Sequence, residues 1–71
     1  MVRKIENAEL VKRISALCQH RLHNGLSYRD FACLGHTTIV KIAQMEHGVC
    51  ASLHEMRNIV TRIENSAFVG A

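Results

Sequence analysis

The sequence contains no proline and no tryptophan, and its only aromatic residues are one tyrosine and two phenylalanines. Strands are enriched in aromatic and β-branched side chains, so this scarcity argues against a protein built mainly from sheets. Apolar residues nevertheless make up 48% of the chain, which suits a compact core. The composition therefore predicts a small all-α fold.

Cysteines are also few, and their number is odd: Cys18, Cys33 and Cys50. Such a widely spaced set is not typical of a disulfide framework, so we expect a reducing, cytoplasmic location. The opening segment MVRKIENAEL lacks the apolar stretch of a secretory signal. No apolar run approaches the roughly 18 residues that a membrane span needs, so we expect no membrane partner.

Length and charge narrow the remaining possibilities. A chain of 71 residues is expected to form one domain, residues 1–71, with a core of marginal size that dimerisation would support. The formal net charge is +3 and the pI is about 9.1. This basic balance is a modest indication of a polyanionic partner, although many small basic domains bind no anion.

Apolar spacing and capping residues predict four helices, at about residues 7–23, 27–33, 38–47 and 52–64. The segments SYRD and SLHE each have the spacing of a capping box at a helix start. The tail, residues 65–71, is expected either to fray or to contribute to a dimer, since Phe68 is a large apolar residue to leave exposed.

Apolar residues that recur at helical spacing are expected to form the core: Leu10, Val11, Ile14, Leu17, Cys18, Phe31, Ala32, Ile42, Met45, Leu53, Met56, Ile59, Val60 and Ile63. Two short helices joined by a tight turn and flanked by longer helices are typical of a helix-turn-helix. Other small helical bundles show the same pattern, so the pattern alone leaves both possibilities open.

Residues 21–63 resemble the Cro/C1-type (XRE-like) helix-turn-helix family of phage and bacterial regulators. RLHNGLSYRDFA matches the family's opening, IAQMEHG its close and SLHEMRNIVTRI its fourth helix. The interval from Gly25 to Gly48 is the family's usual interval without a gap. The resemblance implies a four- or five-helix bundle, a lambda-repressor-like DNA-binding domain, whose third helix enters the major groove.

In such a domain Ile42 and Met45 anchor the third helix to the core. The resemblance implies that the opposite side meets base edges, which makes candidate base readers of Thr38, Ile39, Val40, Ala43 and Gln44. Gln44 can make paired hydrogen bonds to adenine, and apolar side chains can pack on thymine methyl groups. The alternatives are that Gln44 is an ordinary solvated residue and that Ile39 and Val40 belong to the core.

The candidate phosphate contacts are Tyr28, Arg29, Thr37, Lys41 and Arg57. For the three cationic residues the alternative is an ordinary charged surface. Tyr28 stands where the family usually has a glutamine, but its hydroxyl can still donate to a phosphate. His36 occupies the family's usual turn glycine position, and histidine enters positive φ more readily than most residues.

The resemblance also implies a structural salt bridge between Arg21 and Glu46, which would join the first helix to the third. Its role would be to hold the third helix at its angle. The alternative is two independent surface charges.

The sequence shows no clear pattern for a metal site, a catalytic site or a phosphate-binding loop. The histidines and cysteines, among them Cys18, His20 and His23, lack a recognised zinc spacing. A chain this short offers no obvious catalytic pocket, and its isolated glycines indicate no phosphate-cradling loop. We therefore expect no catalytic residue, metal, cofactor or small-molecule effector.

These features predict a sequence-specific regulator of transcription that binds double-stranded DNA. We expect a Cro-like repressor of phage or plasmid origin, which binds a palindromic operator as a homodimer with residues 38–47 in the major groove. The alternative is a protein-interaction module, such as an antitoxin or an anti-repressor, built on the same bundle.

Overall fold

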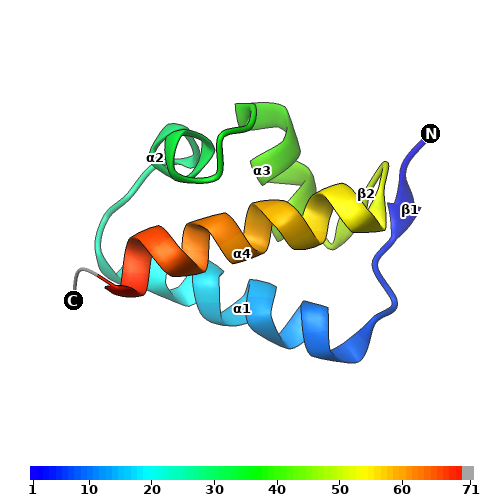
Figure 1. Ribbon diagram of the computed structural model, residues 1–71, viewed down its shortest axis with the longest axis horizontal. Helices are drawn as coiled ribbons and strands as arrows, with labels where there is room; N and C mark the ends of the chain where they lie inside the picture. The colour runs from blue at the N-terminus through cyan, green and yellow to red at the C-terminus, as the bar shows by residue number, and fades with distance from the viewer. Residues whose placement is uncertain (70–71) are drawn as a thin grey trace.

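The computed structural model describes residues 1–69, with side chains as far as residue 66 (Figure 1). Within this range the elements follow one another in the order β1 (Arg3–Lys4), α1 (Ala8–His23), α2 (Tyr28–Leu34), α3 (Ile39–Glu46), β2 (Val49–Cys50) and α4 (Leu53–Val69). None of the helices in the described range is both long enough and apolar enough to cross a membrane.

The helices enclose a single apolar core. Figure 1 shows α1 and α4 side by side along the length of the molecule. α2 packs on α3 and α4, and α3 also packs on α1. β1 and the last turns of α4 lie at opposite ends of the molecule. The largest side chains that are fully buried come from all four helices: Leu10, Leu17, Phe31, Ile42, Met45, Ile59, Val60 and Ile63.

The expectation of four helices and a mostly helical fold is confirmed, but the described chain also forms two short strands, which an all-α fold did not predict. β1 and β2 pair in antiparallel fashion, with Arg3 opposite Cys50 and Lys4 opposite Val49. Ile5 continues the pairing by donating its N–H to the carbonyl of Gly48 at 2.8 Å, and its side chain is buried. Strands of two residues are too short for an alternating apolar pattern, so the sequence carries no periodic signal for them.

Helix starts follow the capping residues closely. Asn7 caps α1 by accepting a hydrogen bond from the N–H of Leu10 at 2.9 Å. At α2 the capping box is complete, since Ser27 Oγ accepts from the N–H of Asp30 and Asp30 Oδ2 accepts from the N–H of Ser27. Each helix begins one residue later than expected because the cap itself lies outside the helix.

The C-terminal end of the fold differs from the expectation. α4 does not end near residue 64 but continues to Val69, so residues 65–69 are helical rather than frayed. The side chain of Phe68 and residues 70–71 lie outside the described part of the chain.

Two residues of the expected core lie at its border. Val11 and Leu53 are 42% and 40% exposed. Leu53 is the first residue of α4, at the end of that helix that lies beside β2 (Figure 1). The buried stripe of α4 therefore starts one turn further on, at Met56.

The turn between α2 and α3 uses two unusual residues for different reasons. Gly35 has an ordinary φ of −89°, but a Cβ at this position would lie 3.1 Å from Ile59 Cγ2 and 3.2 Å from Ile63 Cγ1. His36 takes the left-handed conformation, with φ of 52°, which the family's glycine at this position implied. Gly35 therefore allows α4 to approach closely, while the histidine makes the change of direction.

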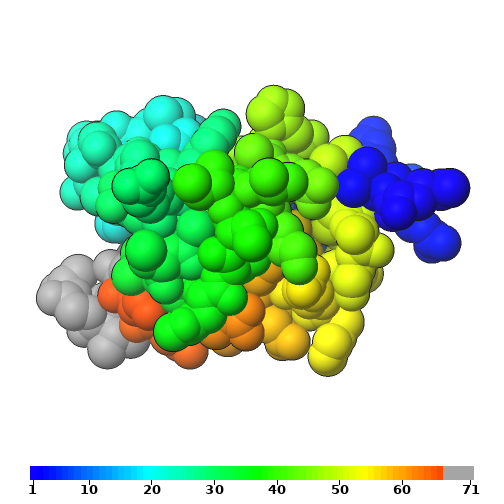
Figure 2. Space-filling view, turned by 90° about the horizontal axis from the view of Figure 1, so that it is seen from above, coloured from blue at the N-terminus to red at the C-terminus, as the bar shows by residue number. Residues whose placement is uncertain are grey.

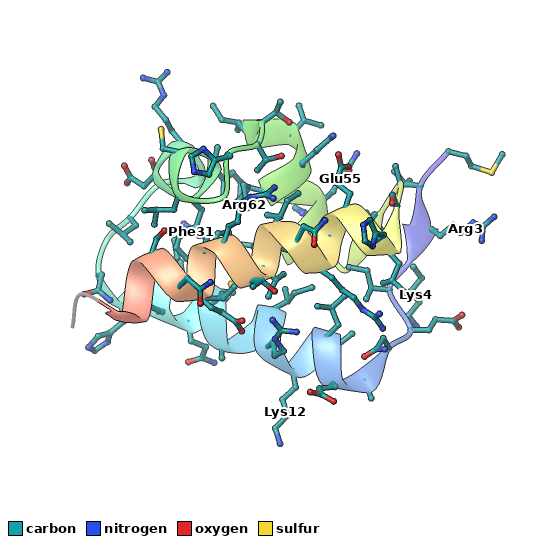
Figure 3. The ribbon with its side chains drawn as sticks, in the orientation of Figure 1. Arg3, Lys4, Lys12, Phe31, Glu55 and Arg62 are labelled. Carbon is teal, nitrogen blue, oxygen red and sulfur yellow. The ribbon has the colours of Figure 1, made fainter. Side chains whose placement is uncertain are left out.

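A hydrogen bond from α4 also holds this turn. Arg62 Nε donates to the carbonyl oxygen of Gly35 at 2.7 Å, which is a charge-assisted contact to a backbone group at the end of α2. Figure 3 shows Arg62 on the side of α4 that faces α2, and Phe31 among the side chains beneath α2. The position of the turn is thus determined by its packing on α4.

We predict that Gly35→Ala lowers the free energy of unfolding by about 1–3 kcal/mol, because the added methyl group overpacks the contact with α4. The measurement is urea-induced unfolding followed by circular dichroism. Cys33→Ala, an exposed position near the end of α2, should change stability by no more than about 0.5 kcal/mol. Equal stability of the Gly35→Ala variant and the natural protein would contradict the packing argument.

Candidate nucleic-acid interface

The rotation of α3 about its own axis decides which of its residues face solvent. Successive residues of a helix are turned by about 100°, and Ile42 and Met45 are both 0% exposed. On the opposite side Ile39 and Val40 are 45% and 64% exposed, so they do not belong to the core. Ala43 and Gln44 lie on the same outer side and are half-buried. We call these four residues, Ile39, Val40, Ala43 and Gln44, the outer side of α3.

One border of the outer side is tied to α1 by the ion pair between Arg21 and Glu46. Arg21 Nε lies 2.6 Å from Glu46 Oε2 and Arg21 Nη2 lies 2.8 Å from Glu46 Oε1, the bidentate geometry that suits a guanidinium and a carboxylate. The two side chains are only 13% and 5% exposed. These hydrogen bonds to Glu46 raise the pKa of the Arg21 guanidinium above its ordinary value, so the guanidinium stays charged.

Arg21 also connects this border to α2. Its Nη1 donates to the carbonyl of Leu26 at 2.9 Å, and its guanidinium carbon lies 4.7 Å from the centre of the Tyr28 ring. Stacking of a guanidinium on an aromatic face is favourable. Tyr28, the expected phosphate contact at the start of α2, is therefore half-buried and held in place through its ring.

Cys18, which was expected only to pack in the core, is a second donor to Glu46. Its Sγ lies 3.2 Å from Glu46 Oε1, and the side chain is half-buried. Burial raises the pKa of the Cys18 thiol, and the hydrogen bond and charge of Glu46 raise it further, so the thiol remains a donor. The spacing of three residues between Cys18 and Arg21 puts both on one face of α1, a signal that could have indicated a shared acceptor.

The other border of the outer side is tied to α4. Lys41 Nζ lies 2.8 Å from Glu55 Oε2, and the two side chains are 38% and 45% exposed. Ser52 Oγ accepts from the N–H of Glu55 at 3.2 Å, but the Glu55 carboxylate pairs with Lys41 instead of closing the capping box. The expected phosphate contact Lys41 therefore already has an anionic partner within the protein.

The remaining candidates divide between two sides of the molecule. Figure 2 shows α2 and α3 at the centre of one face, bordered by the first part of α4 and the N-terminal residues. Arg29 is exposed on α2. Arg57 is not brought together with them, because it lines a shallow hollow with Asn7, Leu10 and Arg13 on the α1 side of α4.

Thr37 and Thr38 stand where the chain enters α3. The N–H of Thr37 donates to the carbonyl of Ala32 at 2.9 Å, so this group is already satisfied. The hydroxyl oxygen of Thr38 accepts from the N–H of Lys41 at 3.2 Å and caps the helix. A hydroxyl that accepts one hydrogen bond can still donate another, which leaves the Thr38 hydroxyl proton for an external acceptor.

Within residues 1–69 no three side chains of histidine, cysteine, aspartate or glutamate are placed to hold a metal ion together. The three cysteines are unpaired. A hollow of about 360 Å³ lies beside β1 and β2 and is lined by residues that include Arg3, Lys4 and Leu53.

Comparison with known proteins finds no matching family model, no matching curated protein and no matching solved structure.

We predict that Arg21→Met lowers the free energy of unfolding by about 3–5 kcal/mol, because it leaves the nearly buried carboxylate of Glu46 without its counter-ion. Denaturant unfolding at neutral pH measures the loss.

Arg13→Met is the matched control. It breaks an equally short pair, Arg13 Nη2 to Glu64 Oε1 at 2.6 Å, whose side chains are 34% and 29% exposed. This pair is also bidentate, but solvent can replace the missing partner, so we expect a clearly smaller loss than in Arg21→Met. Similar losses in the two variants would show that burial does not distinguish the pairs.

Proposed function

We propose that this protein is a sequence-specific regulator of transcription that binds double-stranded DNA, a Cro-like repressor in which α2 and α3 act as a helix-turn-helix. The observation that supports it best is the outer side of α3, on which the apolar side chains of Ile39 and Val40 are exposed. Both borders of this side are tied to other helices by ion pairs. A helix held in this way can present the same side chains to a groove in every molecule.

The chemistry of the outer side suits the edges of A·T base pairs. The amide of Gln44 can pair with N6 and N7 of adenine, and Ile39 and Val40 can pack against thymine methyl groups, which only the major groove displays. Ala43 is small enough to let the backbone approach a base. An operator bound in this way contains A·T pairs where α3 meets it.

The residues around α3 supply contacts to the phosphate backbone. The hydroxyl of Thr38 and the side chain of Thr37 lie at the positive end of the helix dipole. Tyr28 and Arg29 occupy the start of α2. The net charge of +3 assists association with DNA in general.

One such domain cannot select a site in a genome. A paired contact from glutamine to adenine is worth about 1–3 kcal/mol of discrimination, whereas specific binding needs about 4–10 kcal/mol over non-specific binding. We therefore propose a homodimer on a palindrome, with half-sites about one turn of DNA, roughly 34–36 Å, apart.

We propose no catalytic activity, cofactor or small-molecule effector for this protein. Its three cysteines form no disulfide, which suits a reducing cytoplasm.

The test is selection of bound duplexes from a random pool. We expect a symmetric, A·T-containing site, and we expect Gln44→Ala to lose the preference for adenine at one symmetric pair of positions while its affinity falls by about 1–3 kcal/mol. Gln19→Ala, an exposed position on α1, is the matched control and should leave the site unchanged.

Two outcomes would contradict the proposal. An unchanged preference in Gln44→Ala would remove this residue from the base-reading set. Binding without preference between selected and random duplexes would favour the rival function, a protein-interaction module such as an antitoxin or an anti-repressor.

A further inference from the structure

The ion pair between Lys41 and Glu55 is the most exposed of the ties that hold α3. Its nitrogen and oxygen lie 2.8 Å apart, and the side chains are 38% and 45% exposed. The pair between Arg21 and Glu46, by contrast, is 13% and 5% exposed and has two parallel hydrogen bonds. A pair that is open to solvent can exchange partners, whereas the buried pair cannot open without leaving a charge in the core.

The position of the pair puts a negative charge beside the outer side of α3. Lys41 lies at the border of this side, and Figure 3 shows Glu55 at the N-terminal part of α4, towards α3. A duplex that contacts Ile39, Val40 and Gln44 therefore brings its phosphates towards a lysine that already holds a carboxylate. Carboxylate and phosphate are both acceptors for the same ammonium group.

Glu55 has a second hydrogen-bonding place within its own helix. The segment SLHE has the spacing of a capping box, and Ser52 already accepts from the N–H of Glu55. At α2 the equivalent acid, Asp30, closes the box on the N–H of Ser27 at 2.8 Å. When Lys41 turns to another anion, the Glu55 carboxylate can close the box on Ser52 in the same way, so that it need not remain without a partner.

We propose that Glu55 restrains DNA binding by competing with phosphate for Lys41, and that it weakens binding to every duplex by the same factor. This inference rests on the proposed function. The factor is uniform because a contact from lysine to phosphate reads no base. The structure thus divides the surface into residues that choose the sequence, on the outer side of α3, and a pair at its border that sets the overall strength.

The test is Glu55→Gln, measured by fluorescence anisotropy on two probes, the duplex selected above and a scrambled duplex of equal length. Glutamine can also serve in a capping box, so the start of α4 is retained. We expect binding to both probes to tighten by about two- to fivefold, as removal of an exposed ion pair implies, with an unchanged ratio between them.

Glu64→Gln is the matched control. It makes the same change in net charge and also breaks an ion pair, the one between Arg13 and Glu64, which joins α1 to α4 away from α3. We expect its affinity to equal that of the natural protein. Equal tightening in both variants would overturn the inference, because net charge alone would then explain the effect.

A double-mutant cycle with Lys41→Gln separates competition from simple repulsion. We expect Glu55→Gln to tighten binding clearly when Lys41 is present and much less when it is absent. An equal effect in both backgrounds, no effect of Glu55→Gln, or tightening confined to the selected duplex would each overturn the inference while leaving the proposed function intact. Failure of the natural protein to bind any duplex would overturn both.

Discussion

The arrangement of this protein depends on how α3 is fixed about its own axis. Ile42 and Met45 lodge in the core, and the two borders of the helix are tied in opposite directions, by Glu46 to α1 and by Lys41 to α4. Apolar packing alone tolerates some rotation, and the pair of Arg21 and Glu46 restricts it, because that pair cannot open without leaving a nearly buried carboxylate unpaired. The exposure of Ile39 and Val40 follows from this constraint and not from any preference of these residues for water.

The two ties differ in what they contribute. A buried pair of charges adds little net stability, because desolvation offsets much of the attraction, yet loss of one partner is severe. The pair of Arg21 and Glu46, with Cys18 as a further donor, therefore determines orientation more than stability. The exposed pair of Lys41 and Glu55 costs little to open, which is why the same kind of bond can be structural at one border and exchangeable at the other.

The rest of the fold positions α2 and the ends of α3 by contacts with α4 and β1. Gly35 lets the turn before α3 rest on α4, and Arg62 donates to its carbonyl. After α3, the segment at Gly48 is held by Ile5. A chain of this size buries only a limited share of its surface, so its apolar core is small and holds the ends of α3 only in part. Short polar contacts and close backbone approaches supplement that core at both ends of the helix.

The sequence by itself determined what depends on neighbours within about four residues. The helix starts at the segments SYRD and SLHE and the inward residues of α3 could be predicted, because capping and helical periodicity are local. The left-handed turn at His36 was implied by the family resemblance. The pair of Arg21 and Glu46 could be anticipated only through a family resemblance. Only the tertiary structure decided the pairing of β1 with β2, the side of α4 on which Arg57 lies, and the choice of Glu55 between Lys41 and its own capping box. Each of these depends on which segments, distant in the chain, lie side by side in the fold. Neighbouring residues in the sequence do not specify such long-range contacts.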